Sequence, residues 1–518
     1  MKEIILNMIY VCLLLISMII PSKHALHIFQ QSKYVTKRYV DWLKETLKKN
    51  KLSFVYVAFI FMSLFISNYY VTIVFLILFS LFMFNKESKK QYIKPLVYTA
   101  RVKRQIVTLL VIDIILILLF LNNKYILTFT LVALIMNWLL IIVANALLLP
   151  VENMVKNYYL NDAKKILNSF KNLKKIGITG SFGKTSSKNI IQSILSEEYR
   201  SLMTPASYNT PMGITRTIRE HLKPTHQIFV CEMGADHVND IVYLSDFVKP
   251  SIGIVTSIGI QHLATFGSLE KIINEKMSLI EKLPSDGLGI INYDNEYIKK
   301  YKINNNCKII KYGIDEEDVD YRAINIEYST KGSKFNVKTK EGIYSFETRL
   351  LGKHNISNIL AGIIISRELN IEWDDIVKAV KKIPYIEHRL EVKTINGLKF
   401  IDNAFNSNPI GAKMSLEVMK MMPNKRFIVT PGMIDLGKKQ NEANYEFGYS
   451  MKDHVDIVIL VGKNQTKPIK EGLDDSGFET KNIYVVDTVK EAFGLVYQMA
   501  DKNDTILLEN DLPDAYNV

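Results

Sequence analysis

A strand, a glycine-rich turn and a helix follow one another without interruption in the middle of the chain. Residues 176–179 are an apolar strand, residues 180–183 read Gly-Ser-Phe-Gly, and residues 189–195 have a helical pattern. Such a unit directs backbone N–H groups and the N-terminus of a helix at a phosphate chain. We therefore expect a phosphate-binding loop inside an α/β domain.

The residue types in this turn fit a nucleotide triphosphate with Mg²⁺. Gly180 and Gly183 let the backbone approach a phosphate without a Cβ in the way. Lys184 can reach the β- and γ-phosphate oxygens, and Thr185 or Ser186 can bind Mg²⁺. The nucleotide-binding residues expected here are Gly180, Ser181, Gly183, Lys184, Thr185 and Ser186. Ile178 replaces the first glycine of the full spacing, so a glycine turn before an ordinary helix remains the alternative.

The charge of the chain is unevenly distributed. Of its 518 residues, residues 1–176 carry 23 Lys and Arg against 7 Asp and Glu, and the remainder carries 42 against 45. The basic part also holds the apolar runs, so its charge indicates contact with a membrane surface and excludes nucleic acid as the expected partner. Three scattered cysteines indicate neither a disulfide framework nor a thiolate metal site.

Long uncharged segments fill residues 1–150. Residues 52–85 contain 34 residues without a charge. As one helix they would be about 51 Å long, well beyond the ~30 Å hydrocarbon core of a bilayer. The polar pair at residues 67–68 suggests a hairpin of two short spans. With residues 4–20, 105–121 and 125–149, five membrane-spanning helices are expected. A signal peptide at residues 4–20 is disfavoured, since no small-residue cleavage site follows.

The loop charges predict an orientation. Residues 22–51 hold eight Lys and Arg and residues 86–104 hold seven, whereas the other connections hold only Lys124. The positive-inside rule then places the N-terminus outside and everything after residue 149 in the cytoplasm. The expected location is therefore the cell membrane, with cytoplasmic catalytic domains. Asp113 lies inside the fourth span, either as a functional group or in a structural contact with Asn137.

The soluble part reads as alternating strands and helices. A linker helix is expected at 151–174, a nucleotide-binding domain at 175–385, and a second α/β domain at 386–518. Two strands, at 227–231 and 251–257, deliver Glu232 and His262 close to their carboxyl ends, where ligands gather in open parallel sheets. A carboxylate and an imidazole beside the phosphate-binding loop are suitable ligands for nucleotide-bound Mg²⁺. Taken singly, Glu232 could be a solvated strand end and His262 a helix cap.

Two further patterns complete the expected architecture. Residues 319–350 alternate apolar and polar side chains, which predicts antiparallel strands beside the parallel core. Strands at 399–404, 426–430, 456–461, 483–486 and 505–508, with helices between them, predict a Rossmann-like last domain. The fold class expected is therefore an α-helical membrane region followed by α/β domains. The last domain has no glycine fingerprint of its own, so we expect it to close over a nucleotide bound by its neighbour.

Ten motifs between residues 176 and 510 resemble, in their order, those of the ATP-dependent Mur ligases, most closely the MurF branch. In the middle domain these are Ile178-Thr-Gly-Ser-Phe-Gly-Lys-Thr-Ser186, Thr204-Pro-Ala-Ser-Tyr-Asn-Thr-Pro-Met-Gly213, Glu232-Met-Gly234, Val255-Thr-Ser-Ile-Gly-Ile-Gln-His-Leu263, Phe266-Gly-Ser-Leu-Glu270, Glu275-Lys276 and Gly352-Lys-His-Asn-Ile-Ser-Asn358. In the last domain they are His388-Arg-Leu-Glu391, Ile401-Asp-Asn-Ala-Phe-Asn-Ser-Asn-Pro409 and Gly432-Met-Ile-Asp-Leu-Gly437.

The resemblance implies an ATP-dependent amide ligase in cell-wall precursor synthesis. Such an enzyme phosphorylates an acceptor carboxylate, and an amine attacks the acyl phosphate. The implied roles are as follows: Lys184 holds phosphates; Thr185, Glu232, His262 and Lys276 bind Mg²⁺; Asn358, Arg389 and Asp402 bind ATP; Asn209 lies in the substrate cleft. Lys184, Glu232, His262 and Lys276 are the implied catalytic residues. Lys276 stands where the family often carries a carbamylated lysine.

Departures from the family pattern leave the substrate open. Membrane spans replace the family's first, UDP-sugar-binding domain. The Lys-Gly-Ser run of the MurF branch is replaced by Leu508-Glu-Asn-Asp-Leu-Pro-Asp514, which exchanges a cation for acids. The acceptor could be a free or a lipid-linked cell-wall precursor, joined to an amino acid or peptide amine. A ligase resembling poly-γ-glutamate synthases and a P-loop ATPase coupled to transport are the alternatives. Against transport, the spans show only one buried charge and no pair of broken helices.

Overall fold

The computed structural model describes residues 2–49, 63, 68–89, 95–120, 125–261, 263–404, 408–434, 436 and 439–510. The chain forms two compact units, Met1–Tyr158 and Tyr159–Val518.

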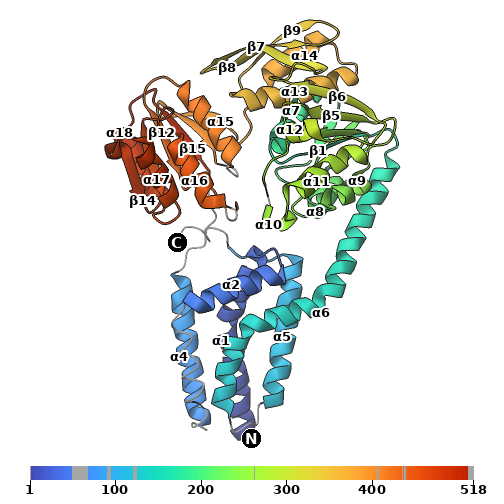
Figure 1. The fold of residues 1–518 in the computed structure, drawn as a ribbon. Coiled ribbons are helices and arrows are strands. Elements are labelled where there is room, and N and C mark those ends of the chain that lie inside the picture. Colours follow the sequence, from blue (N-terminus) through green and yellow to red (C-terminus); the bar gives the residue numbers. More distant parts are fainter. Residues whose placement is uncertain are drawn as a thin grey trace. The chain divides into compact units, whose positions relative to one another are not determined.

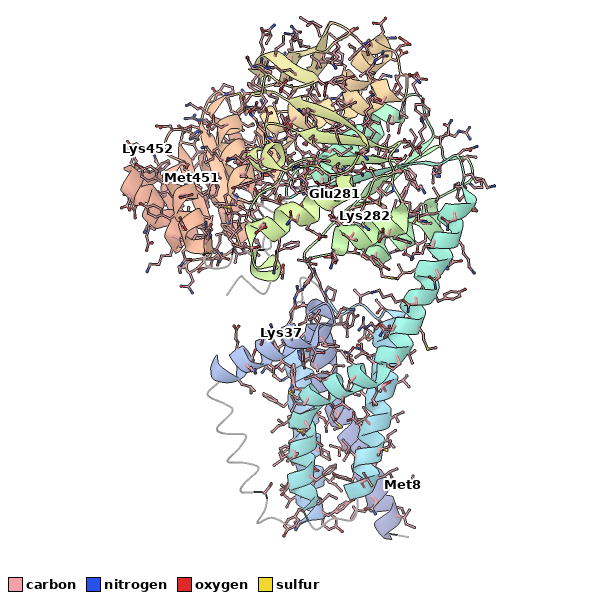
Figure 2. All side chains as sticks on the ribbon, turned by 45° about the vertical axis from the view of Figure 1, so that its right-hand side comes forward. Met8, Lys37, Glu281, Lys282, Met451 and Lys452 are labelled. Atoms are coloured by element: carbon pink, nitrogen blue, oxygen red, sulfur yellow. The ribbon has the colours of Figure 1, made fainter. Side chains whose placement is uncertain are left out.

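The first unit is helical. The helices described in it are α1 (Lys2–Gln31), α2 (Thr36–Lys49), α4 (Tyr69–Ser88), α5 (Ala100–Phe120) and the first part of α6 (Ile126–Ser169). α1, α4, α5 and α6 lie side by side, and α2 runs across them (Figure 1). Among the described residues three segments are long and apolar enough to cross a membrane: Ile4–Gln31, Tyr69–Ser88 and Ile126–Ser169. Their apolar side chains also cover the outside of the bundle, as Met8 does in Figure 2.

The predicted spans correspond only in part to these helices. Residues 4–20 and 125–149 lie almost wholly within α1 and α6, and residues 105–120 lie in α5. The predicted span before the polar pair at 67–68 falls almost entirely outside the described residues. α4 begins directly after this pair, because the side chain of Asn68 accepts the N–H groups of Tyr70 and Val71 and caps the helix. The count of five spans therefore stays a prediction.

No hydrogen bond forms the predicted contact between Asp113 and Asn137. Both side chains are buried, but Asp113 Oδ1 and Asn137 Nδ2 make no hydrogen bond. The Asn137 side chain instead accepts a hydrogen bond from the Ser22 hydroxyl at 2.8 Å. A partner contributed by α1 could not be identified from the sequence, because Ser22 and Asn137 are 115 residues apart.

The predicted last span and the predicted linker are one helix, α6, with Pro150 inside it. Its C-terminal part belongs to the second unit. There Leu160, Ala163 and Leu167 are buried in the same apolar cluster as Ile214 and Phe229. The linker is thus part of the core that it leads into.

A nine-stranded sheet forms the centre of the second unit, in the order β2-β3-β1-β4-β5-β6-β7-β8-β9. The strands are β1 (Lys174–Thr179), β2 (Ser201–Met203), β3 (Ile228–Glu232), β4 (Ile252–Val255), β5 (Leu288–Asn292), β6 (Lys308–Gly313), β7 (Tyr321–Ser329), β8 (Gly332–Lys338) and β9 (Ile343–Thr348). β1 pairs in parallel with both β3 and β4. Their buried side chains are almost all apolar, as expected for central parallel strands covered on both faces. β7, β8 and β9 are antiparallel, which confirms the prediction from residues 319–350.

Helices cover both faces of this sheet (Figure 1). They are α7 (Lys184–Leu195), α8 (Pro211–His221), α9 (Asp240–Val248), α10 (Leu263–Phe266), α11 (Leu269–Glu281), α12 (Glu296–Lys300), α13 (Lys353–Glu368) and α14 (Trp373–Lys382). α7 and α13 pack together in one apolar cluster with β1, β3 and β4. α8, α9 and α11 contribute to a second cluster, with Phe229 and Met233. This arrangement brings the ends of β1, β3 and β4 together at the N-terminus of α7.

A six-stranded sheet follows, in the order β10-β11-β15-β12-β13-β14. Its strands are β10 (Glu391–Ile395), β11 (Leu398–Asn403), β12 (Arg426–Thr430), β13 (Ile457–Val461), β14 (Ile483–Val486) and β15 (Thr505–Glu509). The helices between them are α15 (Pro409–Lys420), α16 (Gln440–Tyr449), α17 (Lys467–Ser476) and α18 (Val489–Met499), with the short helix η2 (Thr480–Asn482). All five predicted strands are present. The parallel order of β11, β15, β12, β13 and β14 gives the expected doubly wound arrangement.

Candidate active site

The phosphate-binding loop connects β1 to α7 and is fixed by the end of β4. The Ser181 N–H donates to the carbonyl of Ser257 (2.7 Å), and the Ser181 hydroxyl donates to the carbonyl of Gly259 (3.0 Å). Gly183 is the residue before α7, with φ of +82°. A Cβ at this position would lie 2.9 Å from Asn358 Oδ1, so glycine is required for both reasons. The first turn of α7 therefore presents its N–H groups beside β4 and α13, as a phosphate site requires.

Lys184 lies folded back on its own loop. Its Nζ donates to the carbonyl oxygens of Gly180 (2.7 Å) and Ser181 (3.2 Å). Burial lowers the pKa of Lys184 to about 8; the charge of Glu232 opposes this shift and that of Arg389 adds to it. A lysine held by neutral carbonyls, with a depressed pKa, gains a counter-charge when an anion enters. The loop is thus arranged for an anionic ligand.

Glu232 ends β3 and lies buried, 1% exposed, next to this loop. Its main-chain N–H donates to Thr204 Oγ1 (3.1 Å), and Asn209 Nδ2 donates to Glu232 Oε1 (2.9 Å). The other oxygen, Oε2, accepts no hydrogen bond although it is buried. A fixed, buried carboxylate oxygen that accepts no hydrogen bond can serve as a ligand of a hard cation such as Mg²⁺.

Lys276, on α11, belongs to the same group of charges. It is 3% exposed, and its Nζ is 3.3 Å from the carbonyl oxygen of Ala235. Burial, with a further contribution from the charge of Lys184, lowers the pKa of Lys276 to about 7; Glu275, Asp240 and Asp236 oppose the shift. Its neighbour Glu275 has a structural task, since its two oxygens accept the N–H groups of Asn239 and Ile241 at the start of α9.

The last domain contributes Arg389 to this site. Burial lowers the pKa of Arg389, and the charges of Glu232 and Glu509 oppose that shift. The residues on either side, His388 and Leu390, have φ of +57° and +50°. Such values cost roughly 1–2 kcal/mol each for residues with a Cβ. A left-handed residue on each side of Arg389 constrains the direction in which its side chain leaves the backbone.

Asn358 and Asp402, both predicted to bind nucleotide, lie in different surroundings. Asn358 Oδ1 accepts a hydrogen bond from Ser187 on α7 (2.9 Å), which places Asn358 beside the phosphate-binding loop. Asp402 Oδ2 lies 2.8 Å from His388 Nδ1 and 3.2 Å from Lys393 Nζ, inside the last domain. Asp402 is therefore linked to the loop region through the segment that carries Arg389.

The structure thus brings together most of the predicted site residues. Gly180, Ser181, Gly183, Lys184, Thr185, Ser186, Glu232, Lys276, Asn358 and Arg389 lie at the loop or act on its charges. His262 lies outside the described residues. Asn209, predicted for the substrate cleft, has its side-chain amide on Glu232.

One charged residue of the site was missed by the sequence analysis. Lys188 follows Lys184 by four residues on α7 and is fully buried, with its Nζ 3.1 Å from Glu232 Oε2. The available signal was its spacing, because residues i and i+4 share one face of a helix. A lysine between Ser187 and Asn189, facing the same direction as the loop lysine, could have been assigned to the site on that ground.

The sequence of the second unit matches two family profiles. Residues 178–366 match the Mur ligase middle domain, and residues 388–509 match the Mur ligase glutamate ligase domain. The chain therefore belongs to the Mur ligase family, as the order of its motifs implies.

Its relatives within this family include UDP-N-acetylmuramoyl-tripeptide--D-alanyl-D-alanine ligases. The protein of that name from Buchnera aphidicola (subsp. Baizongia pistaciae) is 32% identical over 56% of this chain and 63% of its own length. That from Bacillus subtilis is 29% identical over 64% of this chain and 72% of its own length. The chain thus spans less than two thirds of the Buchnera protein.

Solved structures show the same fold. MurF from Thermotoga maritima in complex with ADP superposes with a TM-score of 0.62, at 21% identity, over 69% of this chain and 80% of that one. MurF from Acinetobacter baumannii gives 0.61 at 23% identity, over 69% and 77%.

Proposed function

We propose that this protein is a membrane-anchored, ATP-dependent ligase that forms an amide bond in peptidoglycan precursor synthesis. The observation that carries this proposal is the grouping of the loop lysine Lys184, the buried carboxylate Glu232 and the inter-domain Arg389 at the ends of β1 and β3. Membership of the Mur ligase family supports the reaction class. The MurF-type relatives support a muramoyl-tripeptide as the acceptor and D-alanyl-D-alanine as the amine.

The residues present fit ATP and Mg²⁺. Gly180 and Gly183 have positive φ, which lets the loop turn its backbone toward a phosphate, and Glu232 Oε2 is a buried acceptor without a hydrogen bond. Thr185, Glu232, His262 and Lys276 would hold the metal, and Asn358, Arg389 and Asp402 would contact the nucleotide. The metal supplies a positive charge that stabilises the transferring phosphoryl group.

The side chains of the protein have distinct tasks in the proposed reaction. Lys184 and Arg389 place positive charge where the phosphoryl group and then the tetrahedral oxyanion gain negative charge. Their depressed pKa values reflect a site in which burial has removed water around them. Exclusion of water also protects an acyl phosphate from hydrolysis until the amine attacks.

The helical unit supports a multi-pass membrane location with the ligase domains in the cytoplasm. Three of its segments have the length and composition of membrane spans, and basic residues gather in the two loops predicted to be cytoplasmic. We infer that the acceptor is used at the inner face of the membrane, where a lipid-linked precursor would be available.

Phosphate release by the purified protein distinguishes this proposal from the alternatives. With ATP and Mg²⁺, phosphate release should require both a muramoyl-tripeptide acceptor and D-alanyl-D-alanine, because the amine completes each turnover. Steady release in the absence of an acceptor would contradict the ligase assignment and support an ATPase. A ladder of growing products would support a polymer ligase.

Lys276 is expected to react with carbon dioxide. A pKa of about 7 leaves about half of its amine neutral at pH 7, and the neutral amine is the form that becomes a carbamate. Protein equilibrated with ¹³C-bicarbonate should therefore show a carbamate signal by NMR at pH 8 that weakens toward pH 6, as the amine gains a proton.

The Lys276→Ala variant should lack this signal, and Lys175→Ala, which removes a half-buried lysine on β1, should retain it. A signal of equal strength in Lys276→Ala, or no signal from the native protein at pH 8, would refute the assignment.

A further inference from the structure

Lys188 is a second cation at the carboxylate that we assign to the metal. Its side chain is fully buried on α7, and its Nζ is 3.1 Å from Glu232 Oε2. The same Nζ donates a hydrogen bond to the carbonyl oxygen of Ala206 (2.5 Å). A buried ammonium group is costly unless it is paired, so this ion pair has a reason to persist within the fold.

Lys188 is not needed to hold the Glu232 side chain in place. Two other contacts fix the glutamate: Asn209 binds Oε1, and Thr204 binds the main-chain N–H. Oε2, the oxygen nearest to Lys188, accepts no hydrogen bond from it. Lys188 therefore acts on Glu232 mainly as a nearby positive charge.

The positive charges around Glu232 affect the binding of a free metal ion and of a nucleotide differently. Lys184, Lys188 and Arg389 all act on the one carboxylate of Glu232. A free divalent cation approaching Oε2 meets these positive charges, whereas a triphosphate brings enough negative charge to compensate them. Metal and nucleotide should therefore favour each other's binding, and the linkage is reciprocal.

We propose that Lys188 balances the charge of Glu232 in the nucleotide-free pocket and thereby makes divalent-metal binding depend on bound nucleotide. The inference rests on the proposed function, because it takes Glu232 as a metal ligand and ATP as the nucleotide. Beyond that function, the inference assigns a role to Lys188, which was not among the predicted site residues. It also states that the metal enters the site together with the nucleotide.

The test measures metal binding directly on the full-length protein in detergent. Mn²⁺ is the probe, and the EPR signal of free Mn²⁺ reports how much is bound, with and without a non-hydrolysable ATP analogue. The native protein should bind Mn²⁺ weakly alone and much more tightly with the analogue. Lys188→Met, which has similar length and no charge, should bind Mn²⁺ about tenfold more tightly without nucleotide and gain less from the analogue.

Three further variants separate charge from folding. Lys188→Gln keeps a hydrogen-bond donor and has no charge, so it offers a second neutral replacement if Lys188→Met does not fold. Lys188→Arg keeps the charge and should retain weak Mn²⁺ binding in the absence of nucleotide. Lys175→Met, which replaces a half-buried lysine on β1, should do the same.

Nucleotide-free Mn²⁺ affinity that is unchanged or weaker in a folded neutral variant would overturn the inference and leave the proposed function standing. If the native protein bound no Mn²⁺ even with the analogue, the proposed function would fail and the inference with it.

Discussion

Replacing Lys184 by alanine should lower ATP turnover by about 10³-fold, because it removes the loop cation that faces the transferring phosphoryl group. The fold should tolerate this change. Among the described residues, the ammonium group donates its hydrogen bonds to carbonyl oxygens of its own loop, and the rest of α7 is held by its buried apolar face. Turnover of ATP by the purified variant, measured as phosphate release, checks this expectation.

Lys175→Ala is the matched control for this experiment, because it removes a lysine from the same βα unit without touching the loop. It should turn over ATP at the native rate. Native turnover by Lys184→Ala itself would remove the nucleotide-binding assignment of residues 180–186.

Deleting residues 1–150 should leave a protein that binds ATP but loses about 10²-fold of its activity on a membrane-borne acceptor. The second compact unit begins at Tyr159, so the deletion spares its whole core, including Leu160 and Leu167 of α6. The loss is expected because anchoring raises the local concentration of the enzyme at its acceptor. Comparing amide formation on lipid-linked acceptor in vesicles and on a soluble UDP-linked acceptor measures it.

The soluble acceptor is the internal control in this comparison, since its reaction should be unaffected by the deletion. An undiminished rate on lipid-linked acceptor would show that the reaction does not need the membrane region. A loss on both acceptors would instead indicate that the helical unit contributes to the site or to folding.

Structure could be predicted from the sequence where the signal is a local pattern of residues. A glycine turn between an apolar strand and a helix predicted the loop that places Lys184, and alternating residues predicted the antiparallel strands after β6. In both cases the signal lies within a few residues of what it predicts.

A hairpin in the last domain was missed although its signal is local. β10 pairs with β11 through Asn396-Gly397, with φ of +53° and +83°. An Asn-Gly pair between alternating residues is a strong indication of a two-residue hairpin. The prediction for this region rested on the apolar strand at 399–404, which lies after the turn.

Contacts between distant segments could not be predicted from the sequence. Asn209 and Glu232 are 23 residues apart, and Ser22 and Asn137 are 115 apart. No periodicity relates such residues, so only the packed fold reveals that Asn209 binds a carboxylate and that Ser22 takes the partner expected for Asp113. Lys188 lies between these two cases. Its position on the same helix face as Lys184 was predictable, but its contact with Glu232 was not.

The structure shows the surroundings of one acid, Glu509, in the stretch that replaces the Lys-Gly-Ser run. Glu509, at the end of β15, is fully buried and accepts hydrogen bonds from Asn403 (2.9 Å) and Ser415 (2.7 Å). Its charge also acts on Arg389. An acid at this place is thus built into the last domain, where its charge acts on the same arginine as that of Glu232.

Transfer of oxygen from the acceptor to phosphate tests the central claim most directly. An acceptor labelled with ¹⁸O in its reacting carboxylate is incubated with the protein, ATP, Mg²⁺ and the amine, and the released phosphate is analysed by mass spectrometry. An acyl phosphate formed at the Lys184–Glu232 site predicts one ¹⁸O atom in each phosphate that accompanies an amide bond. Amide formation with unlabelled phosphate would contradict the account.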